Sequence, residues 1–332
     1  KILNVWVNNA KLIVDGGIVN ADWVDIWDGA PVVTLQNSAQ LNVANIKASR
    51  GGEIVVTDAT LTATGSIELG HNAESAGKLT ESGNSTINGE IKLTATGSTV
   101  ASDGGLNVTT NIPDHKVVYE NGEYKVVPCV YVAQVGDVKY ESLQAAIDAA
   151  DGKTVVVLEN ITLTETVTVA AGTTVTLDLN GKTVSQEKEC EASYQMIENK
   201  GALTIKDSTE GANGKISFKD TGAGDPNFGW GSYTIGNYGT LVVENGTIEN
   251  ISEQNPGNGQ PVVHMYCAIQ QGSGAVSTTI NGGTISTPTY RSIRTNTGAL
   301  VINGGTFVGQ VWLQPNQGNT TLEVYGGTFS PA

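Results

Sequence analysis

LVINGGTF, the stretch from Leu300 to Phe307, decides the fold of this chain because looser copies of it recur along the sequence. Most copies carry apolar residues at the first and third positions, a corner built from asparagine and glycine, a threonine and a final apolar residue. The copies cover residues 12–19, 54–61, 177–184, 241–248, 278–285 and 322–329. Because 22 residues separate Thr284 from Thr306 and again Thr306 from Thr328, the sequence predicts a structural repeat of that length.

Short alternating strands within this period indicate one turn of a solenoid. A single turn cannot cover its own apolar face, but stacked turns can, each strand pairing in parallel with the next. The sequence therefore predicts an all-β fold, a right-handed parallel β-helix with about 22 residues per coil. Equivalent positions should then form ladders along the stack, one of asparagines and one of threonines. The expected ladder residues are Asn180, Asn281 and Asn303, and Thr183, Thr247, Thr284, Thr306 and Thr328.

The composition excludes several kinds of partner. The chain has 332 residues, 18 lysines and arginines against 33 aspartates and glutamates, and a formal net charge of −15. Nucleic acids and anionic membrane surfaces attract basic proteins, so we expect neither as a partner. The longest apolar runs are too short to cross a bilayer, so we expect no membrane insertion. We also expect no cofactor, because no glycine-rich phosphate loop precedes a helix.

The coil pattern is interrupted once, near the middle of the chain. Residues 115–128 alternate around an Asn-Gly pair, which predicts a β-hairpin. A short amphipathic helix is predicted near 142–151, where it would cap the apolar end of a new stack. We therefore expect two domains, the C-terminal part of a first β-helical module at 1–127 and a second module at 129–332. One continuous solenoid with a decorated middle is the alternative.

The second module resembles a known family. The segments that carry the resemblance are 130–133, 140–147, 174–183, 291–294 and 302–307. They are similar to the pectate-lyase-like right-handed β-helix modules of large surface proteins from Gram-positive, often gut-dwelling, bacteria. The resemblance implies export, an extracellular or wall-attached location and neighbouring modules in the same long chain. It implies no activity.

A glycine-rich and aromatic insertion, residues 220–233, is the main candidate for a binding surface. Its aromatic rings could stack against sugars or contact a protein, or they could form the small core of a loop folded back on the coil wall. The candidate binding residues, with neighbours from later coils, are Phe228, Trp230, Tyr233, Tyr266, Arg291 and Arg294. Trp6, Trp23 and Trp27 form a similar cluster in the first module, to which we assign a structural role.

No catalytic group can be assembled from the sequence. Arg291 and Arg294 are three residues apart, a spacing that sends strand side chains to opposite faces. The candidate carboxylates are scattered and expected to be solvated; they are Asp207, Asp220, Asp225, Glu244 and Glu249. The three cysteines, Cys129, Cys190 and Cys267, lack metal-ligand spacing, so we expect no metal site and buried thiols.

The function that fits these features is a non-enzymatic module of a secreted or wall-attached bacterial surface protein, acting as a stalk or adhesin. Its partners would be a glycan or a host surface protein. Two alternatives stay open: a carbohydrate-active β-helix related to polysaccharide lyases or glycosidases, and a glycan-binding module.

Overall fold

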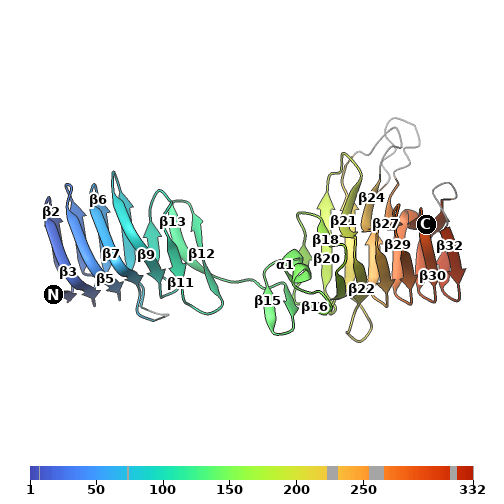
Figure 1. Ribbon diagram of the computed structural model, residues 1–332, viewed down its shortest axis with the longest axis horizontal. Coiled ribbons are helices and arrows are strands. Elements are labelled where there is room, and N and C mark those ends of the chain that lie inside the picture. Colours follow the sequence, from blue (N-terminus) through green and yellow to red (C-terminus); the bar gives the residue numbers. More distant parts are fainter. Residues whose placement is uncertain (7, 73–74, 223–230, 254–264, 315–319, 332) are drawn as a thin grey trace. The chain divides into compact units, whose positions relative to one another are not determined.

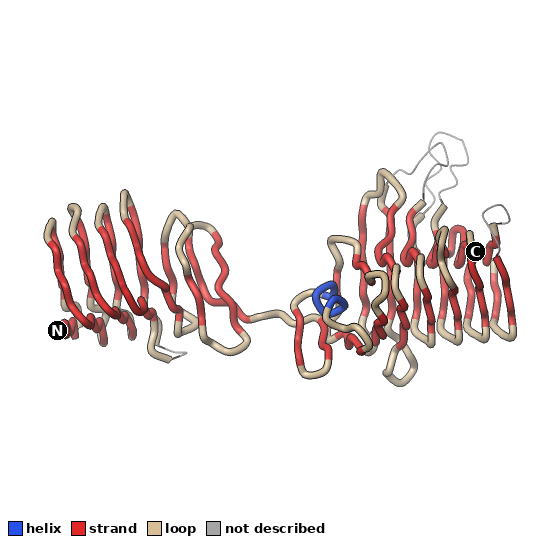
Figure 2. The backbone as a smooth tube through the Cα atoms, in the orientation of Figure 1, coloured by secondary structure: helices blue, strands red, loops and turns tan. Residues whose placement is uncertain are grey.

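The chain divides into two compact units, Lys1–Cys129 (unit 1) and Val130–Ala332 (unit 2). The computed structural model describes residues 1–6, 8–72, 75–222, 231–253, 265–314 and 320–331. It is all-β, as predicted, with 59% strand and 2% helix, and its sheets are mostly parallel, with one curled into a half-barrel. Within each unit the strands lie side by side in long sheets (Figures 1 and 2).

The described residues of unit 1 form thirteen strands in two sheets. The strands are β1 (Ile2–Trp6), β2 (Lys11–Asp15), β3 (Ile18–Trp27), β4 (Val32–Gln36), β5 (Gln40–Ser49), β6 (Glu53–Thr57), β7 (Thr60–Leu69), β8 (Lys78–Ser82), β9 (Thr86–Leu93), β10 (Thr99–Ala101), β11 (Val108–Thr110), β12 (His115–Glu120) and β13 (Glu123–Pro128). One sheet has the order β1-β3-β5-β7-β9-β11 and the other β12-β13-β10-β8-β6-β4-β2. Pairing is parallel except where the hairpin β12–β13, predicted at 115–128, joins β10.

Alternation along the strands separates the core of unit 1 from its outer wall. In β5, Ile46 and Ala48 are fully buried, whereas Lys47 between them is partly exposed. The same alternation buries Val24 and Ile26 of β3. The strand period of two thus places a row of polar side chains on the outside of the six-stranded sheet.

Within the ranges of unit 2 that the structure describes there are one helix and twenty strands. These elements are β14 (Ala133–Val135), β15 (Val138–Tyr140), α1 (Leu143–Asp148), β16 (Lys153–Val157), β17 (Ile161–Thr162), β18 (Val167–Val169), β19 (Thr174–Asp178), β20 (Thr183–Lys188), β21 (Tyr194–Asn199), β22 (Ala202–Lys206), β23 (Lys215–Asp220), β24 (Ser232–Asn237), β25 (Thr240–Val243), β26 (Thr247–Asn250), β27 (Cys267–Gln271), β28 (Ser277–Ile280), β29 (Thr284–Thr295), β30 (Gly298–Ile302), β31 (Thr306–Leu313), β32 (Thr320–Val324) and β33 (Thr328–Ser330). One sheet has the order β15-β14-β16-β19-β22-β25-β28-β30-β32 and the other β17-β20-β23-β26-β29-β27-β24-β21-β18.

Strand β29 joins the two arms of that second sheet. Its first residues pair in parallel with β26, and its last residues pair in parallel with β27. Strand β31 pairs in parallel with both the first and the last residues of β29, and the register of this pairing shifts on either side of Arg291. The side chains of β24, β27, β29 and β31 are thereby brought next to one another.

The helix α1 is shorter than predicted at 142–151. Ser142 is its N-cap, and the Ser142 Oγ accepts a hydrogen bond from the Ala145 backbone N–H at 3.1 Å. The helix ends at Asp148 because Ala149 forms its C-cap. Leu143, Ala146 and Ile147 are buried against the first strands of unit 2, so the helix covers one end of its core.

The threonine ladder forms as expected, with one substitution. Register partners run from coil to coil in the order Thr183, Lys215, Thr247, Thr284, Thr306 and Thr328. Lys215 therefore lies between Thr183 and Thr247 in this row, where the sequence predicted no ladder residue. Thr284, Thr306 and Thr328 are thus consecutive register partners, 22 residues apart.

The asparagine ladder is only partly correct. Asn303 Nδ2 donates to Asn281 Oδ1 at 2.8 Å, but Asn180 lies outside their row. Asn281 directly follows the last residue of β28, whereas Asn180 is separated from β19 by the fully buried Leu179. This wider turn shifts Asn180 out of line, and its Nδ2 donates to the Val157 carbonyl at 3.0 Å instead.

Candidate functional site

Three of the predicted binding residues meet on β24 and β29 of unit 2. Tyr233 is the register partner of Cys267, which is the register partner of Arg291. Arg294 Nη1 donates to the Tyr233 hydroxyl at 3.4 Å. Tyr266 is fully buried beside this row. Phe228 and Trp230 lie outside the described residues.

We call Arg291, Arg294 and Trp312 the arginine–tryptophan cluster. The Arg291 guanidinium carbon lies 3.2 Å from the centroid of the Trp312 ring, and that of Arg294 lies 5.6 Å from it. The expectation that the two arginines face opposite ways is wrong, because the register shift between Arg291 and Ile293 breaks the alternation. Arg294 also donates to Gln314 Oε1 at 2.6 and 3.2 Å, which fixes its guanidinium.

Arg291 is the arginine of this cluster whose guanidinium lacks hydrogen-bond partners, in the described part of the chain, at some of its nitrogen atoms. Its side chain is 7% exposed, and its Nε and Nη1 have no hydrogen-bond partner among the described residues. Burial lowers the pKa of its guanidinium from the ordinary value. The rings of Tyr290, at 4.2 Å, and Trp312 compensate through cation–π attraction, which accounts for a cation held in an apolar setting.

The hydroxyl and thiol groups beside the cluster are held protonated. Burial, and next the proximity of Cys267, raise the pKa of Tyr233 to about 12. Burial raises the pKa of the Cys267 thiol to about 12 as well. Near neutral pH neither group supplies a base or a thiolate nucleophile.

Two carboxylates expected to be solvated are buried at the ends of strands, Asp207 directly after β22 and Asp220 as the last residue of β23. Asp207 is 3% exposed and accepts hydrogen bonds from the backbone of Gly181 at 3.0 Å and Thr209 at 2.9 Å, and from Gly214. Asp220, also 3% exposed, accepts from the Ser232 hydroxyl at 2.7 Å. Both carboxylates are occupied in holding the backbone of the coils.

The other candidate carboxylates form surface contacts between coils. Glu244 accepts from Asn281 Nδ2 at 2.9 Å, and Glu249 pairs with Lys215 Nζ at 3.3 Å. Asp225 lies outside the described residues. The described carboxylates of unit 2 that the sequence singled out therefore support the stack.

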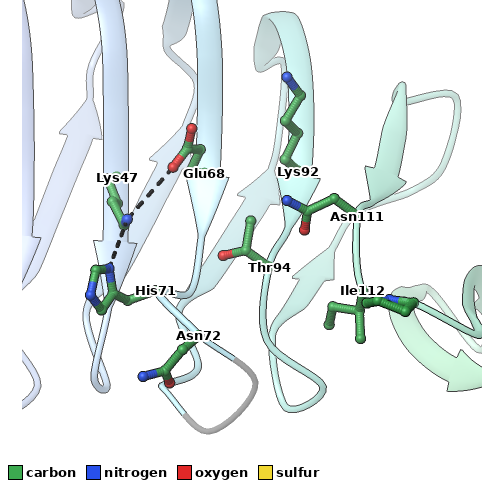
Figure 3. A pocket seen from close by; sticks show the side chains of 9 residues that line it. Lys47, Glu68, His71, Asn72, Lys92, Thr94, Asn111 and Ile112 are labelled. Atoms are coloured by element: carbon green, nitrogen blue, oxygen red, sulfur yellow. Dashed lines mark hydrogen bonds and ion pairs between the residues drawn. The ribbon is translucent and has the colours of Figure 1, made fainter.

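The outer wall of unit 1 carries a second polar surface, which we call the outer groove (Figure 3). It is a hollow of about 470 Å³ over β5, β7 and β9, lined by Lys47, Glu68, His71, Asn72, Lys92, Thr94, Asn111, Ile112 and Pro113. The Lys47 ammonium lies 3.6 Å from the Glu68 carboxylate and donates to the His71 Nδ1 at 3.1 Å. These contacts hold the Lys47 side chain in the wall of the groove.

An aromatic hollow adjoins the outer groove. It encloses about 200 Å³ between Trp23, Asp25, Trp27, Lys47, Ser49 and His71, so Lys47 and His71 line both hollows. The Trp27 ring packs edge-on against Trp6 with centroids 5.5 Å apart, and the Arg50 guanidinium lies 4.7 Å from its centroid. The sequence indicated a tryptophan cluster here but not the charged side chains Lys47 and Glu68 beside it.

Within the part of the chain that the structure describes, no group of three or more His, Cys, Asp and Glu side chains is arranged to hold a metal ion. The helical content of the described ranges includes nothing long and apolar enough for a membrane crossing. None of the three cysteines, all of which are described, forms a disulfide.

Comparison of the chain with protein-family models, with curated proteins and with solved structures finds no match in any of the three.

Proposed function

We propose that the chain is a non-enzymatic module of a secreted or wall-attached bacterial surface protein, acting as a stalk or adhesin. In this proposal each unit is a right-handed β-helix of the pectate-lyase-like kind, and its partners are a glycan or a host surface protein. The observation that carries the proposal is the parallel register at the start of β26, β29, β31 and β33, in which threonine pairs with threonine from Thr247 to Thr328.

Such a stack suits a mechanical or presenting role. Each coil is bonded to its neighbours through parallel strands, so stability accumulates along the stack and loops can be inserted without disturbing it. Uncharged rows of threonine and asparagine need no compensating ions. The outer wall is then free to carry binding residues.

The commitment of side chains to structure supports a role without turnover. Asp207 and Asp220 bind backbone and side-chain donors, and Tyr233 and Cys267 are protonated at neutral pH. A glycosidase needs two carboxylates available to the substrate, and a lyase needs a free base.

A glycan-binding role for unit 2 is the second candidate, favoured by Arg291. The buried Arg291 guanidinium has two nitrogen atoms without a hydrogen-bond partner among the described residues. These nitrogen atoms can donate hydrogen bonds to a carboxylate or sulfate group of a ligand. Under this reading, Arg291→Ala weakens binding of the full chain to hexagalacturonate at least about tenfold, whereas Lys153→Ala, an exposed cation of the same unit, leaves it unchanged. Equal binding by both variants would remove this candidate.

The main proposal is tested by incubating the full chain with neutral and acidic polysaccharides and following new reducing ends and the ultraviolet absorbance of unsaturated products. We expect no product above the buffer control. Time-dependent product that disappears when Arg291 or Arg294 is replaced would overturn the proposal. Antibody labelling of intact producing cells tests location, and labelling that requires lysis would contradict a surface role.

A further inference from the structure

The outer wall of unit 1 carries a row of alternating charges, one from each successive coil. Asp25 is the register partner of Lys47, Lys47 of Glu68, and Glu68 of Lys92. Adjacent strands are about 4.8 Å apart, so opposite charges follow one another at that step across the sheet. The four charges sum to zero.

This alternation selects against a charged ligand. A carboxylate or sulfate lying over Lys47 would have Asp25 and Glu68 on either side of it, and a cation over Glu68 would meet Lys47 and Lys92. A sugar hydroxyl both donates and accepts, so it can bond to an ammonium and to the neighbouring carboxylate at once. The row is therefore complementary to a neutral polyhydroxylated ligand.

The aromatic hollow supplies the second element of such a site. Trp23 and Trp27 project from the same face of β3, four residues and about 13 Å apart along the strand, with Asp25 between them. Indole rings stack on the apolar C–H faces of sugar rings while hydroxyl groups reach polar neighbours. The Trp27 Nε1 donor is buried without a hydrogen-bond partner among the described residues, so one indole N–H is still to be satisfied beside the hollow.

Lys47 and His71 join the two elements. Both line the aromatic hollow and the larger outer groove, so an extended ligand can pass from the tryptophans onto the charged row without leaving the wall. The Lys47 side chain is 20% exposed and its ammonium is positioned by Glu68 and His71. Its orientation is set before any ligand arrives, which reduces the entropy lost on binding.

We propose that the outer groove and the aromatic hollow together bind a neutral oligosaccharide. A sugar ring stacks on Trp23, and hydroxyl groups of the next sugars bond between Lys47 and Glu68. This site lies in unit 1, apart from the arginine–tryptophan cluster, and it goes beyond the proposed stalk function, which stands whether or not the groove binds sugar.

The test is calorimetric titration of the full chain with four neutral hexasaccharides, cellohexaose, laminarihexaose, mannohexaose and maltohexaose, and with hexagalacturonate as the charged counterpart. We expect at least one neutral hexasaccharide to saturate a single site, with affinity that changes less than about twofold when salt is raised about tenfold. Trp23→Ala and Lys47→Ala should each weaken that binding about tenfold or more. Trp23→Phe, which keeps a stacking ring, should retain most of it.

Lys78→Ala is the matched control, because Lys78 is an exposed lysine on β8, in the other sheet of unit 1. Hydrogen exchange of the core peptides of unit 1 verifies that each variant is folded. The proposal is overturned if no neutral hexasaccharide binds, if Trp23→Ala and Lys47→Ala weaken hexagalacturonate binding more than neutral-sugar binding, or if these two folded variants bind neutral sugar as well as Lys78→Ala. Turnover of any of these sugars would count against the non-enzymatic proposal and leave the groove assignment in place.

Discussion

Replacing Asp207 by alanine should destabilise unit 2 far more than any change at an ordinary surface carboxylate. The Asp207 carboxylate accepts four hydrogen bonds: two at Thr209 (2.9 Å from the backbone N–H and 2.7 Å from the hydroxyl), one from Gly181 at 3.0 Å and one from Gly214. Gly181 belongs to the preceding coil, so this one side chain ties two coils together. Glu210, three residues further on, is exposed and serves as the control.

The expected loss follows from the burial of the donors. The bond to the Gly214 N–H is buried, and leaving that donor unsatisfied costs about 1–3 kcal/mol. The bonds to Gly181 and Thr209 are partly buried, so water can replace them at a smaller cost. We therefore expect Asp207→Ala to lower the free energy of unfolding by about 3 kcal/mol, and Glu210→Ala to change it by less than about 0.5 kcal/mol.

The effect should depend on pH in a defined direction. Burial alone would raise the pKa of Asp207, but the hydrogen bonds from Thr209, Gly214 and Gly181 outweigh it and hold the pKa below its ordinary value. A carboxyl group whose folded pKa is depressed adds stability above its unfolded pKa of about 3.9, and this stability is lost as pH falls through the folded pKa. The difference between wild type and Asp207→Ala should therefore be full at pH 7 and shrink below about pH 4.

Hydrogen exchange in a urea series, read by mass spectrometry, measures this effect because peptides of unit 2 are followed separately from those of unit 1. Peptides over β22 and β25 should lose protection at lower urea in Asp207→Ala, and those of unit 1 should not change. If Asp207→Ala is no more destabilising than Glu210→Ala, or if their difference grows toward acid pH, the assignment of Asp207 as a coil-joining residue is wrong.

Two further predictions concern buried side chains of unit 2 and their exposed counterparts. Burial raises the pKa of Cys267 to about 12. At pH 8 a disulfide reagent should therefore label the partly exposed Cys129 first and Cys267 only on unfolding. Rapid labelling of Cys267 in the native protein would contradict its burial. Phe307 is fully buried and stacks on Phe329 with centroids 4.9 Å apart, so Phe307→Ala should lower the free energy of unfolding by about 3–5 kcal/mol. Phe329 is 50% exposed, and Phe329→Ala should cost less than about half as much in the same urea unfolding experiment; equal losses would be inconsistent with this packing.

The sequence predicted the parallel stacking because that feature depends on local, repeated chemistry. The threonine after each corner recurs at a fixed spacing wherever the turn has a fixed length, and the Asn-Gly pair near 121–122 specifies the hairpin β12–β13. The turn after β19 contains one more residue than its counterpart after β30, so Asn180 leaves the row that Asn281 and Asn303 form. A template of fixed length cannot register such an insertion.

The sites were harder to predict because they join residues from different coils. Strand alternation predicted that Arg291 and Arg294 lie on opposite faces of the sheet. A register shift beside Arg291 instead allows both guanidinium groups to contact Trp312. Asp207 was expected in solvent because its donors, which include Gly181, come from turns whose geometry the sequence does not specify.

The outer groove did leave a signal in the sequence. Asp25, Lys47, Glu68 and Lys92 are separated by 22, 21 and 24 residues, nearly one coil each. Aligning charged residues at the coil period, as was done for threonine, would have placed them in one row. Their burial, their mutual contacts and the adjoining tryptophan hollow could be obtained only from the structure.

The register of the coils is the claim on which the whole account depends, and a paired-cysteine experiment tests it most directly. Thr284 and Thr306 are register partners on adjacent coils, at a separation that a disulfide can bridge, whereas Thr284 and Thr328 are two coils apart. The account predicts that mild oxidation links Thr284→Cys to Thr306→Cys nearly quantitatively in the folded chain and leaves Thr284→Cys with Thr328→Cys unlinked. Failure of the first pair to form, or equal formation of both, would contradict a stack of 22-residue coils.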